Sequence, residues 1–95
     1  MTEKQYYMVC RNINEVRTWE ETVSLIVPTT QREKRQWVKK PVEGPIQAAK
    51  ATIDFFNATL RGTENAREII EVFELEPDGN RRQLWAGVHP SSQAT

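Results

Sequence analysis

The sequence predicts a small α+β domain of two layers, in which an antiparallel sheet of four to five strands is packed by one main helix. Two observations favour this class. Hydrophobic residues recur every three or four positions in one segment, residues 45–61, as they do in an amphipathic helix. The other apolar segments are short, alternate with polar residues and end at turn-forming residues, as strands do. The expected order of elements is β-β-(β)-α-β-β.

The segment 45–61 has the end signals of a helix. Pro45 suits the first helical position, where no backbone N–H is needed, and Gly62 suits the residue after the last turn. The stripe expected to face the sheet consists of Ile46, Ala49, Ile53, Phe56 and Leu60. Phe55 lies well outside this stripe. Either a loop or strand end covers Phe55 within the chain, or this residue lies at an interface.

Residues 4–12 and 16–27 are predicted to form an antiparallel hairpin. The first strand has an apolar face of Tyr6, Met8 and Cys10. The second strand is expected to face the core with Val23, Leu25 and Val27. Pro28 is expected to end it, because proline has no N–H to donate to a neighbouring strand.

The segment between this hairpin and the helix is harder to assign. Lys39, Lys40 and Pro41 suit an exposed sheet edge, because they discourage further strand pairing, so residues 36–40 are predicted as a weak strand. Residues 29–35 are predicted as a loop. Thr30 and Glu33 have the spacing of a capping box, so a short helical turn is an alternative there.

Residues 67–76 form the best predicted strand. One face is expected to carry Ile69, Phe73 and Leu75, and the other Ile70 and Val72. Apolar residues on both faces indicate a central strand that is covered, at least in part, on both sides. A turn at residues 77–80 leads into a partner strand at 81–88. We therefore expect a single domain over residues 1–88 and a flexible tail at 89–95.

The charge of the chain is unevenly distributed, although its formal net charge is zero. Residues 31–40 hold five basic residues and one acidic residue, a net charge of +4. Residues 64–78 hold six acidic residues and one basic residue, a net charge of −5. The chain is therefore a charge dipole in sequence, and the pairing of its segments decides whether it is one in space.

Several classes of protein are disfavoured. No segment is apolar for long enough to form a membrane-spanning helix, and the N-terminus has no signal-peptide pattern, so we expect a cytoplasmic protein. Cys10 is the single cysteine, which excludes an internal disulfide. No residues have the spacing of a metal site or a catalytic constellation. We therefore expect no cofactor, and binding is favoured over enzymatic activity.

The basic segment is the clearest ligand-binding signal. Its cations surround one aromatic residue, and the set is Arg32, Lys34, Arg35, Trp37, Lys39 and Lys40. Cations contact phosphates and aromatic rings stack on bases, so this composition is typical of nucleic-acid binding. The same segment could pair with an acidic protein surface or form a solvated loop. The acidic second half of the chain would repel a polyanion unless the basic segment is well separated from it.

Self-association is expected through the side of the helix that carries Phe55, outside the stripe expected to face the sheet. The residues assigned to this interface are Phe55, Ala48, Ala51 and Ala58. Trp19 and Trp37 have charged neighbours and are further interface candidates, whereas Trp85 is expected in the core.

Three functions are therefore considered. The leading hypothesis is a non-enzymatic module that binds a partner protein and forms a homodimer. The alternative is a nucleic-acid-binding accessory protein that uses residues 32–40. The third is a small enzyme or small-molecule binder with a pocket between helix and sheet. Small α+β domains host many functions, so the fold class does not decide between them.

Overall fold

The computed structural model describes residues 4–13, 15–59 and 66–89, which form six strands and one helix. Four strands make the main sheet: β1 (Gln5–Asn12), β2 (Thr18–Val23), β5 (Arg67–Leu75) and β6 (Arg81–His89). Two more, β3 (Ile26–Glu33) and β4 (Gln36–Pro41), pair only with each other and form the β3–β4 hairpin. The helix α1 (Pro45–Thr59) follows β4. The predicted α+β class, with one helix and antiparallel sheets, is confirmed.

The main sheet has the strand order β2-β1-β5-β6, and all its neighbours are antiparallel. The predicted hairpins β1–β2 and β5–β6 are both present, and they meet where β1 pairs with β5. Gly79, with φ of +92°, lies in the turn between β5 and β6, where glycine adopts this conformation without steric cost. Asp78 accepts a bond from the backbone N–H of Asn80 in the same turn.

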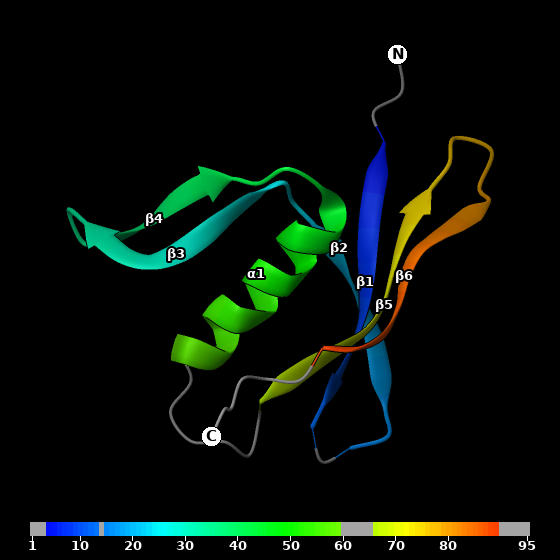
Figure 1. Ribbon diagram of the computed structural model, residues 1–95, viewed down its shortest axis with the longest axis horizontal. Coiled ribbons are helices and arrows are strands. Elements are labelled where there is room, and N and C mark those ends of the chain that lie inside the picture. The colour runs from blue at the N-terminus through cyan, green and yellow to red at the C-terminus, as the bar shows by residue number, and fades with distance from the viewer. Residues whose placement is uncertain (1–3, 14, 60–65, 90–95) are drawn as a thin grey trace.

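The helix α1 lies between the main sheet and the β3–β4 hairpin (Figure 1). Ala49 and Ile53 are buried in the core, and they belong to the predicted stripe. On another side of α1, Phe55 contacts Trp37 of the hairpin. The wide apolar surface of this helix is thus explained, because two separate sheets cover it.

One hydrophobic core joins the main sheet to α1 and the start of the hairpin. Its buried members are Met8, Cys10, Val23, Val27, Ala48, Ala49, Ile53, Ile69 and Val72. The helix is also tied to the sheet by polar bonds. The side chain of Asn57 accepts a bond from the backbone N–H of Arg67 and donates one to its carbonyl, both at 2.9 Å.

The prediction of one long second strand was wrong. The chain leaves the main sheet after Val23 and enters the hairpin at Ile26, so two strands replace one. Ser24 supports the bend, because its Oγ accepts a bond from the N–H of Ile26 at 3.2 Å. Leu25, which was expected to face the core, is 38% exposed at this bend.

The predicted end of this strand at Pro28 was also wrong, and so was the loop predicted at residues 29–35 as far as residue 33, because only residues 34–35 form a turn. Pro28 lies inside β3, opposite Lys39. Proline is tolerated there because β3 has a neighbour on one side only, so no second strand needs its N–H. The register between the strands shifts after Pro28 and resumes at Arg32 opposite Trp37. The predicted weak strand at residues 36–40 is confirmed as β4.

The predicted division of faces in β5 was wrong as well. A register shift between Ile69 and Glu71 leaves Ile70 as an extra residue, which reverses the alternation of faces. Ile69 and Val72 are therefore both in the core beside α1. Phe73 lies opposite Tyr7 of β1 and stacks on its ring at 5.6 Å.

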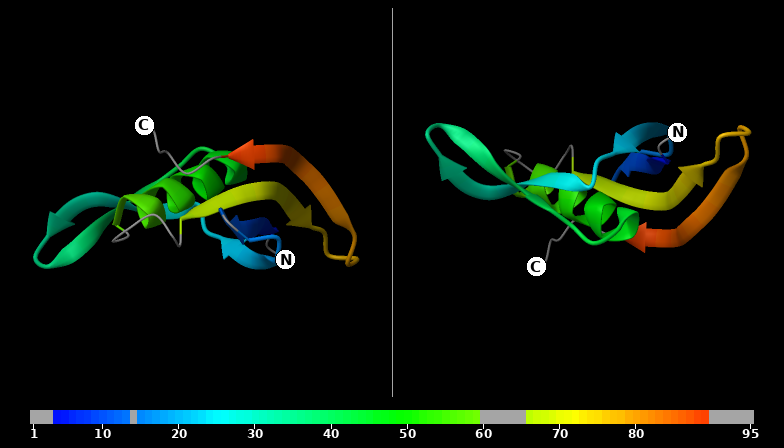
Figure 2. Two further views of the ribbon diagram at one scale, coloured as in Figure 1. Left: turned by 90° about the horizontal axis from the view of Figure 1, so that it is seen from below. Right: turned by 90° about the horizontal axis from the view of Figure 1, so that it is seen from above.

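The molecule is flat when viewed along its sheets, and the hairpin projects from one end (Figure 2). The predicted helix end at Leu60 to Gly62 lies outside the described residues. The tail at 90–95 also lies outside them, whereas His89 belongs to β6. Within the part of the chain that is described, no helix is long and apolar enough to cross a membrane.

Candidate binding surface

The tip of the β3–β4 hairpin is built from two basic residues in an unusual backbone conformation. Glu33 pairs with Gln36, so Lys34 and Arg35 are the two residues of a tight turn. Their φ angles are 52° and 70°. Positive φ at both positions is typical of the turn that matches strand twist, and Asn-Gly is the sequence that usually adopts it. Lysine and arginine adopt this conformation at a cost, because their Cβ atoms crowd the backbone.

Trp37 is the aromatic centre of the hairpin. Its ring makes an edge contact with Phe55 of α1, with 5.2 Å between the centroids. The guanidinium of Arg32 lies over the indole, 5.0 Å from the ring centroid. Arg32 also donates a bond of 3.0 Å to the carbonyl of Arg35. Trp37 is thus held in place by two elements, yet it is 40% exposed.

A groove of about 480 Å³ runs between the hairpin and the helix. Its lining consists of Pro28, Arg35, Gln36, Trp37, Lys39 and Phe55. A second groove continues along α1 and shares Pro28 and Phe55 with the first. The remaining lining of this second groove is Val27, Thr29, Thr30, Ala51, Asp54 and Ala58. The first groove is therefore bordered by cations, and the second by apolar and small polar residues with one carboxylate.

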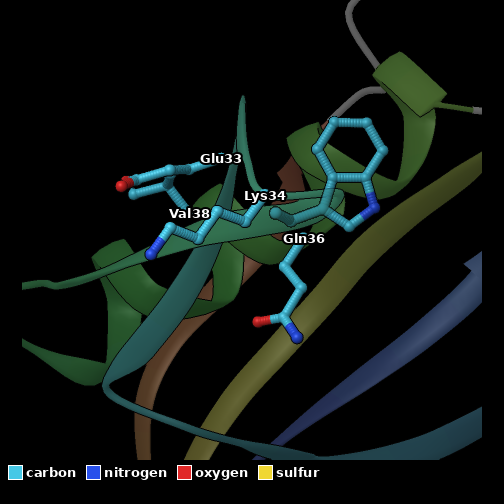
Figure 3. Close-up of a pocket in the computed structure, with 5 residues that line it drawn as sticks. Glu33, Lys34, Gln36 and Val38 are labelled. Carbon is cyan, nitrogen blue, oxygen red and sulfur yellow. The ribbon is translucent and has the colours of Figure 1, made fainter.

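A further hollow lies at the hairpin tip, and Glu33, Lys34, Gln36, Trp37 and Val38 line it. Figure 3 shows the side chains of Lys34 and Gln36 pointing in different directions from the hairpin. Gln36 and Trp37 line both this hollow and the groove beside α1. Polar and aromatic groups are therefore presented around the whole tip.

Most cations in and beside the main sheet have acidic partners, and Arg82 of β6 is an exposed exception. Four salt bridges are present among the described residues, and they join Arg11 to Glu68, Arg67 to Glu21, Arg81 to Glu20, and Lys4 to Glu74. Glu68 and Glu74, from the acidic second half of the chain, are themselves buried. Much of the negative charge of β5 is thus neutralised where it lies.

The cations of the hairpin differ in this respect. Within the described ranges, the hairpin cations form no salt bridge. Arg32, Lys34, Arg35, Lys39 and Lys40 are all exposed. The hairpin therefore presents an excess of positive charge to solvent, on a sheet separate from the one that holds the acidic strand β5.

The structure brings together residues that the sequence assigned to two different sites. Arg35, Trp37 and Lys39 share the first groove with Phe55, while Arg32 lies over Trp37. Lys34 lies at the tip. Lys40 follows Lys39 and so points to the opposite face of β4.

The four residues assigned to self-association do not all lie on one surface. Ala51, Phe55 and Ala58 line the second groove, whereas Ala48 is 0% exposed and packs in the core. Sequence reasoning missed Pro28 and Gln36. Pro28 lies opposite Lys39 across the hairpin. This pairing could not be predicted when residues 29–33 were expected to be a loop rather than a strand.

The other candidates have structural roles. Trp19 packs against the core beneath the guanidinium of Arg67, 5.2 Å from its ring centroid, and Trp85 also packs against the core. Cys10 is fully buried, and this burial raises the pKa of its thiol to about 12, with a smaller contribution from the charge of Glu21. A protonated, buried thiol is not a nucleophile. Within the part of the chain described, no three acidic, histidine or cysteine residues cluster as metal ligands.

No protein-family model, curated protein or solved structure matches this chain.

Proposed function

We propose that this protein is a non-enzymatic module that binds nucleic acid through the β3–β4 hairpin. The observation that supports the proposal is a contrast between the two sheets: Arg11, Arg67 and Arg81 of the main sheet lie in salt bridges, whereas the five hairpin cations are exposed and form none among the described residues. Phosphate contacts supply most of the affinity of non-specific nucleic-acid binding, and they need cations that no carboxylate has already neutralised. The hairpin provides five such cations around one exposed tryptophan.

The acidic strand β5 and the basic hairpin are separated in the fold, which also favours a polyanionic ligand. The acidic second half of the chain would repel phosphates if it lay beside the basic segment. Instead, β5 lies inside the main sheet, where Glu68 is paired with Arg11 and Glu74 with Lys4. The hairpin projects from the body on the far side of α1 (Figure 1). A polyanion on the hairpin would therefore contact mostly positive charge.

Fluorescence anisotropy with labelled RNA and DNA oligonucleotides tests this proposal. The variant Arg35→Glu/Lys39→Glu should lose at least about tenfold in affinity at low salt. The slope of log affinity against log salt concentration should also fall, by an amount that corresponds to about two phosphate contacts. The matched control is Arg17→Glu/Arg82→Glu, which makes the same charge change at exposed residues away from the hairpin. This control should bind nearly as tightly as the wild type.

Three results would overturn the proposal. One is an absence of binding by the wild type at low salt. The second is an equal loss in the two charge-reversal variants, which would mean that net charge alone governs binding. The third is equally tight binding of an acidic polypeptide such as polyglutamate, which would indicate an acidic protein as the partner.

A second candidate function is self-association through α1 as a protein-interaction module. It is favoured by the groove beside β3, which is lined by three of the residues that the sequence assigns to a self-interface: Ala51, Phe55 and Ala58. A second copy of the chain would cover the apolar part of this groove.

A further inference from the structure

We infer that the nucleic acid bound at this surface is single-stranded, and that one of its bases stacks on the Trp37–Arg32 pair. This inference rests on the proposed function and names the ligand class of the same site.

Trp37 has the properties of a stacking platform. Its ring is fixed by an edge contact with Phe55, so little side-chain freedom is lost when a base binds. It nevertheless keeps 40% of its surface exposed among cations. Stacking on such a ring tolerates any base, because every base has a flat aromatic face.

Arg32 extends this platform. Its guanidinium already lies over the indole, at 5.0 Å from the ring centroid. Bases in RNA-binding proteins stack on arginine planes as well as on aromatic rings. A base can therefore add to the outer side of Arg32 or replace it on the indole, and the contact between Trp37 and Phe55 stays intact in either case.

The position of the groove favours a single strand over a duplex. One wall of the groove is the hairpin and the other is α1, which contributes Phe55. A duplex keeps its bases stacked inside and presents its phosphates outside, so it would contact the exposed cations and leave Trp37 unused. A single strand has unstacked bases that can enter between hairpin and helix.

The charges around the groove orient the strand. Arg35 and Lys39 border the groove that holds Trp37, and Gln36 offers an amide to a base edge. The second groove along α1 has no basic residue in its lining, so it offers a phosphate no cation. The backbone of the strand is therefore placed along Arg35 and Lys39, with the base turned toward Trp37.

The test compares one oligonucleotide of about 12 nucleotides as a single strand and as a blunt duplex, at the same salt concentration. Wild-type protein should bind the single strand at least about tenfold more tightly than the duplex. Trp37→Leu should weaken single-strand binding by about tenfold or more and leave duplex binding unchanged, whereas Trp37→Phe should retain most of the affinity. Circular dichroism melts of both variants check that they fold.

A direct readout uses fluorescence of Trp37 in a Trp19→Phe/Trp85→Phe background. Stacking should quench this emission on addition of the single strand, and the duplex should leave it unchanged. Equal affinity for single strand and duplex, or an unquenched Trp37 in the saturated complex, would overturn the inference while leaving the proposed function standing. If neither form of nucleic acid binds, the proposed function itself fails.

Discussion

Cys10 lies in the middle of the core, opposite Trp19 on one neighbouring strand and Ile69 on the other. Burial raises the pKa of its thiol from 9.0 to about 12, because the thiolate would lose its solvation, and the nearby Glu21 adds repulsion. The folded protein therefore keeps this proton at pH values where the unfolded chain releases it. Cys10 fills space in the core and is chemically inert there.

We therefore predict a loss of stability with rising pH that depends on this residue. Above about pH 9, the unfolded chain binds fewer protons than the folded one, so the free energy of unfolding falls by up to about 1.4 kcal/mol per pH unit. Urea denaturation of the wild type and of Cys10→Ala from about pH 8 to pH 10.5 measures this difference. The two curves should converge as the pH rises, and a constant separation would contradict the prediction.

Arg67 shows why a tryptophan among charged residues is a poor signal of an interface. Its guanidinium lies 3.7 Å from the ring centroid of Phe56 and also faces Trp19, and it forms a 3.0 Å salt bridge with Glu21. The indole of Trp19 donates to the same carboxylate. The charged neighbours of Trp19 are therefore its packing partners within the chain; Arg32 likewise packs over Trp37, but Trp37 remains exposed.

At the scale of elements, the hairpin tip combines positive φ with two long basic side chains. We predict that Lys34→Asn/Arg35→Gly raises the free energy of unfolding by about 1–2 kcal/mol, because Asn and Gly adopt this turn with less strain. The same change should weaken nucleic-acid binding, because two cations are lost. Urea denaturation and fluorescence anisotropy measure the two effects.

The control for this prediction is Lys34→Gln/Arg35→Gln, which removes both charges and keeps long side chains at the strained positions. It should lose affinity without a gain in stability. A tip variant that is no more stable than this control would show that the positive φ angles impose no cost.

Most elements could be predicted from local patterns, because α1, β1, β5 and β6 each have clear periodicity or turn signals. The division of residues 16–27 could not. Val23, Leu25 and Val27 alternate without interruption, so this apolar pattern does not reveal the bend at which the chain passes from the main sheet to the hairpin. The bulge at Ile70 was hidden for a similar reason, since apolar residues on both faces of β5 conceal a reversal of alternation.

The candidate site was predictable in part. Clustering of cations around Trp37 in the sequence indicated the hairpin as a candidate binding surface. The groove was not predictable, because Pro28, Trp37 and Phe55 are far apart in the sequence and meet only when the hairpin folds over α1. Separate hypotheses for the basic segment and for Phe55 therefore described two parts of one region.

At the scale of the whole molecule, the second groove gives a testable prediction about self-association. If α1 forms a homodimer interface, the wild type should have the mass of a dimer in size-exclusion chromatography with light scattering at about 100 μM. Ala58→Asp should give a folded monomer, because Ala58 is exposed at the groove and its replacement would bury a charge at the interface.

The matched control is Gln47→Asp, which adds the same charge at an exposed position of α1 outside this groove. It should remain a dimer. Ala58→Asp is preferred to Phe55→Asp, because Phe55 supports Trp37 and its loss would disturb the hairpin as well. A monomeric wild type at every concentration would exclude the α1 interface.

The pairing of β1 with β5 has a consequence for synthesis on the ribosome. The chain emerges from its N-terminus, so the β1–β2 and β3–β4 hairpins can form while residues 67–75 are still being made. Until β5 arrives, one edge of β1 has no partner, and Met8 and Cys10 lack their neighbours Val72 and Ile69. We therefore expect the nascent chain to be most prone to aggregation in this interval, which ends when β5 pairs with β1 and β6 then adds to β5.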